Sequence, residues 1–297
     1  MYMRMAVMAA GAAAAFGAEV AAMDTGGLQA IQVWQTEAVF RQPESAVFDP
    51  GEGYIYISNV DGAAGDKDGK GFISRLTTDG KVEQLEWLTG LHAPKGMAIV
   101  GDRLYVADID ALVEIDIPSA AVARRYEAAG AKFLNDVTAD AQGAVYVSDM
   151  MTDTIHRLQQ GRFEVWLQGP ALQGPNGLLA DGDRLLLGTW GVMVDGFKTD
   201  VPGHVKVISL KDRSIADLGS DKPIGNMDGI ELLPGGMVLA TDWMNGALLT
   251  VAPDGKVTRL LDLNQGSADH DYLAAEQLAV VPMMNDGIVT GYRIEER

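Results

Sequence analysis

Residues 226–263 are the most informative stretch of this sequence, because clear turn signals divide them into four short apolar runs. The runs read GIELL, MVLATD, ALLTV and VTRLLDL, and Gly, Pro, Asn or Asp residues separate them. Runs of about five residues rich in Val, Ile, Leu and Thr, interrupted in this way, are typical of an antiparallel meander. A four-stranded meander of this length predicts one blade of a β-propeller.

The same unit recurs along the chain. We take as a marker the residue that opens each first strand, and the end of the second strand follows 13–15 residues later. The six markers are Glu44, Lys95, Asn135, Asn176, Asp228 and Asp269. Their intervals of 51, 40, 41, 52 and 41 residues fit propeller blades. We therefore predict an all-β fold, a six-bladed propeller of four-stranded antiparallel blades, as a single domain over residues 23–297.

The two ends of this propeller complete each other. Residues 269–297 supply only three strands of the sixth blade, and residues 31–40, IQVWQTEAVF, form a spare strand before the first marker. Pairing them closes the ring and removes two exposed sheet edges. The N-terminal strand is therefore expected to complete the last blade.

Two long loops, residues 60–71 and 190–203, account for the two longer intervals. Both fall between second and third strands, on the marker face, where they are expected to flank the mouth of the channel as lids or specificity loops. Trp87 and Trp166 end outer strands and are expected to pack between blades. Trp190 and Trp243 end second strands on the marker face, where they line a substrate pocket or cap the core.

The net charge of −18 argues against a nucleic-acid backbone or an anionic membrane as partner. The chain has no cysteine, which excludes disulfides, thiol chemistry and a Cys-based zinc site. Residues 1–22 combine Arg4, a short apolar run and a small-residue cleavage site before Met23. This pattern predicts a cleaved secretory signal and a periplasmic or secreted protein. The alternative is an alanine-rich N-terminal helix, which Glu19 favours.

In a closed propeller the markers meet at one mouth of the central channel. Structure alone does not need polar residues there, because clustered buried charge costs several kcal/mol unless it is paired or coordinates a metal. Glu44 and Asp228 supply carboxylate oxygens, and Asn135 and Asn176 supply neutral carbonyl oxygens. This set is typical of a site for Ca²⁺ or another oxygen-preferring divalent ion, with water or substrate at the open positions.

Lys95 conflicts with a simple metal site, since an ammonium group at the rim repels a cation. It can instead pair with Glu44 or with Asp269. Three carboxylates and one lysine among the markers leave a net charge of −2, which a divalent ion would neutralise. The alternative is a metal-free salt-bridge network that plugs the channel.

Four short motifs lie at the markers: PES at residues 43–45, LND at 134–136, PNGL at 175–178 and MDGI at 227–230. With these motifs in the right blades, the chain resembles the senescence-marker/gluconolactonase (regucalcin-like) family of six-bladed calcium propellers over about residues 31–297. The resemblance implies that Glu44, Asn135, Asn176 and Asp228 hold a divalent metal and that Asp228 is the general base or nucleophile. It also implies hydrolysis of a sugar lactone or another ester.

This chain departs from the family at two places. The family commonly has Glu-Gly-Pro where residues 44–46 read Glu-Ser-Ala, and its sugar-lactonase members carry an arginine where Phe133 stands. The resemblance therefore leaves the substrate open between a sugar lactone and a more apolar ester or lactone.

Our first hypothesis is a monomeric hydrolase of the lactonase type that acts on a small-molecule substrate and depends on Ca²⁺, or on Zn²⁺, Mn²⁺ or Mg²⁺. Asp228 is its catalytic base. The residues expected to contact substrate or to support the metal ligands are Lys95, Asp269, Phe133, Asn59, Asp149, Trp190, Asp242 and Trp243.

Two other classes remain open from the sequence. One is a non-enzymatic propeller whose lid loops bind a ligand or protein and whose markers form a structural polar plug. The other is a quinone-cofactor sugar dehydrogenase, which only fold-level analogy supports.

Overall fold

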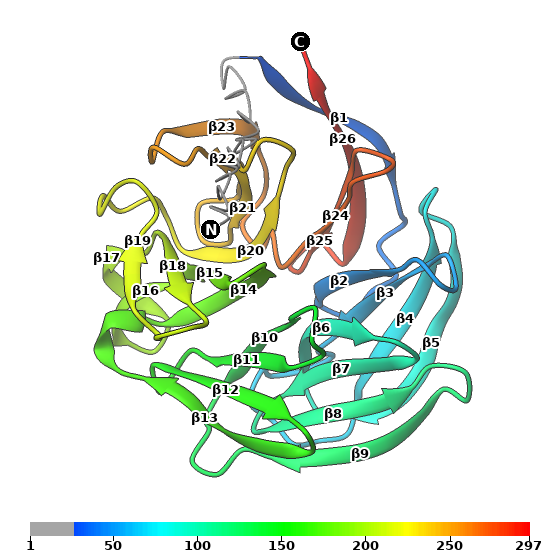
Figure 1. Cartoon of the computed structure of the whole chain (residues 1–297). Coiled ribbons are helices and arrows are strands. Elements are labelled where there is room, and N and C mark those ends of the chain that lie inside the picture. The colour runs from blue at the N-terminus through cyan, green and yellow to red at the C-terminus, as the bar shows by residue number, and fades with distance from the viewer. Residues whose placement is uncertain (1–26) are drawn as a thin grey trace, which may run out of the picture.

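The computed structural model describes residues 27–297, and within that range the chain folds into six four-stranded antiparallel sheets. The sheets stand around a common centre (Figure 1), which confirms the predicted six-bladed all-β propeller. The predicted secretory signal, residues 1–22, lies outside the described residues. No helix in residues 27–297 has both the length and the apolar character needed to cross a membrane.

Each of the first three blades is a simple meander in chain order. Blade one contains β2 (Pro43–Asp49), β3 (Tyr54–Asn59), β4 (Gly71–Thr77) and β5 (Val82–Leu91). Blade two contains β6 (Pro94–Val100), β7 (Arg103–Asp108), β8 (Ala111–Asp116) and β9 (Ala121–Glu127). Blade three contains β10 (Leu134–Ala139), β11 (Val145–Asp149), β12 (Thr154–Gln159) and β13 (Arg162–Gln168).

Blade four differs because a hairpin interrupts it after its second strand. The blade contains β14 (Pro175–Asp181), β15 (Arg184–Thr189), β18 (Val205–Ser209) and β19 (Ile215–Asp217), and a short 3₁₀ helix, η1 (Pro170–Leu172), precedes it. The inserted hairpin pairs β16 (Gly191–Asp195) with β17 (Lys198–Pro202). The second long loop of the sequence is therefore an ordered two-stranded ribbon.

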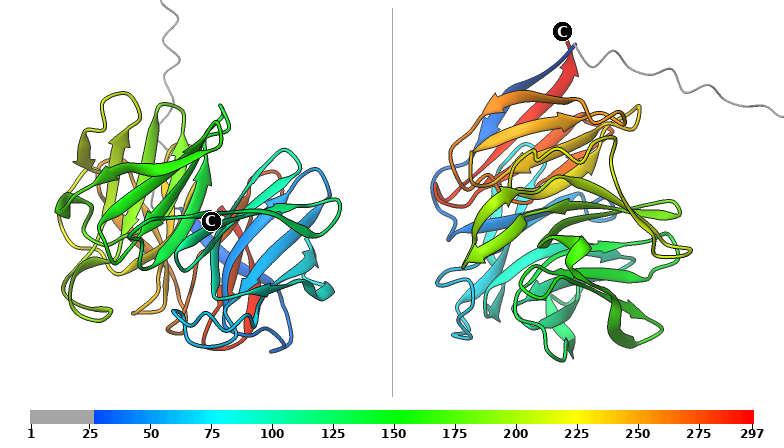
Figure 2. Two further views of the ribbon diagram at one scale, coloured as in Figure 1. Left: turned by 90° about the horizontal axis from the view of Figure 1, so that it is seen from below. Right: turned by 90° about the vertical axis from the view of Figure 1, so that its left-hand side faces the viewer.

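The last two blades complete the ring. Blade five contains β20 (Met227–Leu232), β21 (Val238–Asp242), β22 (Ala247–Val251) and β23 (Val257–Asp262). Blade six contains β24 (Asp271–Leu273), β25 (Leu278–Met283), β26 (Ile288–Glu296) and, from the other end of the chain, β1 (Leu28–Gln35). β1 lies beside β26 (Figure 2) and pairs with it from Leu28↔Glu296 to Gln35↔Thr290. This pairing confirms the predicted closure, with the strand starting three residues earlier than expected.

The core lies between neighbouring blades. Trp87 contacts the ring of Tyr56 at a centroid distance of 4.7 Å, and both pack against residues of blade two such as Leu104. Trp166 contacts Tyr146 at 5.2 Å within the cluster between blades three and four. The predicted packing role of these two tryptophans is confirmed.

Each of the first five inner strands breaks its ladder at the same place. In blade one, Pro43 pairs with Asn59 and Ala46 with Ile57, so two residues face the single Ser58. The same shift follows the first pair of β6, β10, β14 and β20. Such a bulge bends the strand and re-aims its side chains. The first bulged residues are the predicted markers Glu44, Lys95, Asn135, Asn176 and Asp228.

A hydroxyl group opposite three of these bulges accepts the backbone N–H that the bulge frees. The pairs are Ser58 with the N–H of Ser45, Ser148 with that of Asp136 and Thr241 with that of Gly229, each at 2.9 Å. Thr241 Oγ1 also donates to the carbonyl oxygen of Ala268 at 2.9 Å, which links blade five to blade six. These hydroxyls fix the backbone from which the markers project.

Replacement of Thr241 by valine should therefore destabilise the fold although it hardly changes side-chain volume. It leaves the buried Gly229 N–H and Ala268 carbonyl without a partner, and each such group costs about 1–3 kcal/mol. We expect the free energy of unfolding in urea to fall by about 2–4 kcal/mol. Thr258→Val on the outer strand β23, the matched control, should change it by less than about 0.5 kcal/mol. Equal effects of the two substitutions would contradict this role of the hydroxyl.

Candidate metal and catalytic site

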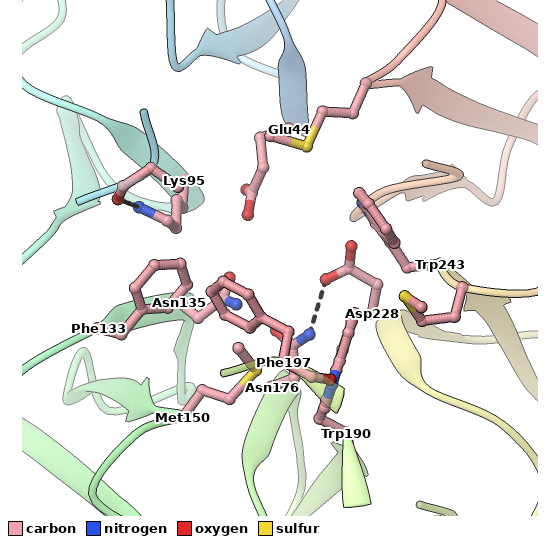
Figure 3. Close-up of a pocket in the computed structure, with 13 residues that line it drawn as sticks. Glu44, Lys95, Phe133, Asn135, Met150, Asn176, Trp190, Phe197, Asp228 and Trp243 are labelled. Carbon is pink, nitrogen blue, oxygen red and sulfur yellow. Dashed lines mark hydrogen bonds between the residues drawn. The ribbon is translucent and has the colours of Figure 1, made fainter. Parts of the chain in front are cut away.

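Five of the six predicted markers line one pocket at the centre of the propeller, with a volume of about 170 Å³. We call these five residues the polar ring: Glu44, Lys95, Asn135, Asn176 and Asp228. All five side chains are buried. In Figure 3 the carboxylates of Glu44 and Asp228 project into the pocket from blades one and five. The bulges thus bring together residues that lie up to 184 positions apart in the chain.

The oxygen atoms of the polar ring are only partly satisfied by the protein. Asn176 Nδ2 donates to Asp228 Oδ1 at 3.0 Å, which orients the amide so that its own oxygen is free. Asn176 Oδ1 and Glu44 Oε2 are both buried and have no hydrogen-bond partner. Unpartnered buried acceptors of this kind are costly unless a cation or a donor meets them. The donor set therefore fits an ion that prefers oxygen ligands.

Burial and neighbouring negative charges raise the pKa values of the two carboxylates in the polar ring. Burial raises the pKa of Glu44 well above its ordinary value, the charge of Asp228 raises it further, and Lys95 only partly opposes this. Burial likewise raises the pKa of Asp228, with the charge of Asp269 adding to it. No group of three His, Cys, Asp or Glu residues within 27–297 is arranged for a metal, so a cation here needs the asparagine oxygens too.

Lys95 does not form the ion pair expected from the sequence. None of the ion pairs in the described part of the chain joins Lys95 to Glu44 or Asp269. Instead, Lys95 Nζ donates to the carbonyl oxygens of Ala93 and Ala64 at 2.9 and 3.0 Å. Burial lowers its pKa to about 8, although the charge of Glu44 opposes that shift. Lys95 thus does not form the salt-bridge plug that the sequence left open as the alternative to a metal site. It ties the 60–71 loop to the ring through the carbonyl oxygen of Ala64.

Asp269 does not belong to the polar ring, and its prediction as a marker is wrong by one residue. In blade six Ser267 pairs with Met283, the last residue of the second strand. Ser267 therefore corresponds to Pro43 of blade one and Met227 of blade five, which pair with the last residues of their second strands. The residue that follows, Ala268, therefore occupies the marker position. Asp269 lies one step further along the channel, where it accepts a hydrogen bond from Ser45 Oγ at 2.6 Å.

A second layer of ionisable residues lies along the channel beyond the polar ring. It lines a separate cavity and contains Asp136, Glu231, Asp269, His270 and Asp271. Burial raises the pKa of Asp269 to about 7 and lowers that of His270 to about 3. Asp269 therefore acts on the ring by its charge, since it is a cause of the raised pKa values of Asp228 and Glu44.

Aromatic side chains form the wall of the pocket. Trp190 and Trp243 both line it, with ring centroids 6.0 Å apart, and both also pack in the apolar cluster of Phe133 and Met150. Phe133 also lines it, and Lys95 Nζ lies 4.4 Å from its ring centroid. Phe197 of the inserted hairpin was not singled out from the sequence, although it lies in the predicted lid loop.

The three remaining predicted site residues do not line the pocket. Asn59, Asp149 and Asp242 end their second strands and hydrogen-bond to backbone amides of adjoining loops. Asp149, for example, accepts from the N–H groups of Lys132 and Phe133 at 2.9 and 3.1 Å. These side chains hold the loops that lead into or flank the inner strands, so they support the site from behind.

Comparisons with known proteins agree with this architecture. The family model described as the SMP-30/Gluconolactonase/LRE-like region matches residues 42–267, well over half of the 297 residues. The chain belongs to this family. No curated protein matches the sequence.

Solved structures share the fold at low sequence identity. A gluconolactonase from Xanthomonas campestris is similar with a TM-score of 0.67 and 14% identity, over 92% of this chain and 97% of that one. A catalytically inactive virginiamycin B lyase from Staphylococcus aureus with quinupristin has a TM-score of 0.59 and 14% identity, over 90% and 99%. At such identity the likeness shows the fold of this family member and not its reaction.

The raised pKa of Asp269 predicts a pH-dependent stability for this SMP-30/gluconolactonase family member. An unfolded aspartate has a pKa of about 3.9, whereas the folded value is about 7. The folded state therefore binds this proton more tightly, and its stability falls as pH rises from about 4 through about 7. After EDTA treatment, we expect the melting temperature to fall between pH 5 and pH 8, and to fall less in Asp269→Asn. The exposed Asp183→Asn is the control, and an unchanged pH slope in Asp269→Asn would show that other groups cause it.

Proposed function

We propose that the chain hydrolyses a lactone or related ester in the central pocket, with a divalent cation, Ca²⁺ first, held by the polar ring. The observation that carries this proposal is the pair of unpartnered buried oxygens, Glu44 Oε2 and Asn176 Oδ1, in one pocket with Asp228. Membership of the SMP-30/gluconolactonase family supports the reaction class. The ligands would be Glu44, Asn135, Asn176 and Asp228.

A divalent ion bound there supplies Lewis acidity, which draws electron density from a substrate carbonyl and stabilises the negative charge that develops on its oxygen. The chain itself supplies the base. Asn176 holds Oδ1 of Asp228, and the carboxylate projects into the pocket (Figure 3). The second oxygen of this carboxylate can accept a proton from the water that attacks the substrate.

The proton balance of hydrolysis needs only this one group. Asp228 takes a proton from the attacking water while the oxygen of that water bonds to the carbonyl carbon. The bond between that carbon and the ring oxygen of the lactone then breaks, and the leaving alkoxide receives the proton from Asp228. The product is a hydroxy acid, and the carboxylate is regenerated.

Metal binding is the first test. We expect one Ca²⁺ per chain, and a melting temperature that EDTA lowers by about 5–10 °C, because an ion at 100 times its Kd stabilises by about 2.7 kcal/mol. Glu44→Gln should abolish this shift, whereas the exposed Glu276→Gln should retain it. Calorimetric titration with Ca²⁺, Mg²⁺, Mn²⁺ and Zn²⁺ ranks the ions. No bound ion and no shift would instead favour a non-enzymatic binding propeller.

Asp228→Asn is the test of the reaction. The amide keeps the size of the side chain but cannot accept the proton, so kcat on lactones and aryl esters should fall at least about 100-fold. Circular dichroism should remain that of the wild type, and Asp183→Asn should keep full activity. Turnover retained in the Asp228 variant would refute the assigned base.

A further inference from the structure

The pocket walls point to a particular class of substrate. Beyond the polar ring, the remaining eight residues that line the pocket are all apolar. Four of them are the aromatic residues Phe133, Trp190, Phe197 and Trp243. The volume of about 170 Å³ is comparable with that of apolar protein cavities that bind benzene. The pocket therefore has room for about one ring-sized group. It is open to solvent beside Phe197 and Met244, which are 41% and 39% exposed, so a larger substrate can extend from the polar ring along the aromatic wall.

Two polar groups beside this wall already bond to the protein. The indole N–H of Trp190 donates to the carbonyl oxygen of Phe197 at 2.7 Å. Lys95 directs its ammonium group to the carbonyl oxygens of Ala64 and Ala93 and lies over the ring of Phe133. The hydroxyl groups of a polyhydroxylated substrate that lie against the aromatic rings, away from the polar ring, would lose water without equivalent hydrogen bonds in return.

The wall is held in place by contacts between its own rings. Phe197 meets Phe133 edge to face at a centroid distance of 5.2 Å and Trp190 at 6.2 Å. Met193, on β16, packs against the cluster formed by Phe133, Met150 and Trp190. The inserted hairpin is thus anchored by apolar contacts, and it carries Phe197 over the pocket.

We propose that the site selects lactones or esters that carry an apolar substituent of about the size of a phenyl ring, and that Phe197 of the inserted hairpin determines this selectivity. This inference rests on the proposed hydrolytic function. The carbonyl of the substrate lies at the polar ring, and its substituent packs against Phe133, Trp190 and Phe197. Sugar lactones are excluded because their hydroxyl groups would face these rings.

Three six-membered lactones test the selectivity on the Ca²⁺-loaded full chain: δ-valerolactone, δ-phenyl-δ-valerolactone and D-glucono-δ-lactone. Burying a phenyl group should raise kcat/KM about 10- to 100-fold over δ-valerolactone, after correction for spontaneous hydrolysis. D-glucono-δ-lactone should be the poorest of the three. Equal rates for the first two, or preference for the sugar lactone, would overturn the proposal.

Phe197→Ser tests whether the inserted hairpin determines the selectivity for an apolar substituent. The ratio of kcat/KM between the phenyl-substituted and unsubstituted lactones should fall about tenfold, because one of the three rings that contact the substituent is lost. Val257→Ser is the control, since Val257 is as exposed as Phe197, at 41%, but lies on the outer strand β23. An unchanged ratio in Phe197→Ser would refute its role in selectivity.

Failure of the hydrolytic function is distinguishable from failure of this inference. If no lactone is hydrolysed, calorimetric binding of δ-phenyl-δ-valerolactone and δ-valerolactone still measures the selectivity of the pocket. Tighter binding of the phenyl compound, weakened in Phe197→Ser, would support an apolar site without hydrolysis. Equal affinity of the two would overturn the substrate class itself.

Discussion

The pairing of β1 with β26 is the interaction on which the rest of the structure depends. A propeller blade is stable only as a member of a closed ring, because each blade buries its faces against its two neighbours. Blade six has three strands from the C-terminal end and completes its outer edge with a strand from residues 28–35. This pairing joins the ends of the chain, and closure then makes the inner strands converge on one axis.

Convergence has an electrostatic consequence. Glu44, Asp228 and Asp269 project into a narrow interior in which burial and the charges of neighbouring carboxylates raise their pKa values. Such crowding is costly for a fold, and a divalent ion at the polar ring would relieve it. The lysine in the ring does not neutralise the carboxylates by direct contact, because its ammonium group is bonded to backbone carbonyls. The pocket therefore keeps its unpartnered oxygens beside an apolar wall.

Much of this arrangement could be predicted from the sequence. The interval of the markers gave the number of blades, and five of the six markers meet in the pocket. Asp269 was misplaced because intervals of 13–15 residues are all compatible with a blade, and the count of 14 back from Met283 was chosen where the bridge of Ser267 to Met283 makes it 15, at Ala268. Asp149 was expected near the substrate because it ends a strand at the marker face, but its carboxylate is used up by backbone amides.

By itself, the sequence determined the blade count, the strand that closes the ring and the polar residues at the start of five of the six inner strands. These follow from local signals: apolar runs, turn residues and a regular period. Only the tertiary structure decided that Lys95 binds Ala64 rather than Glu44, that Ala268 takes the sixth place and that Phe197 reaches the pocket. Those outcomes depend on bulge register and side-chain direction between segments far apart in the chain, and a one-residue shift in a strand reverses the face on which a side chain lies.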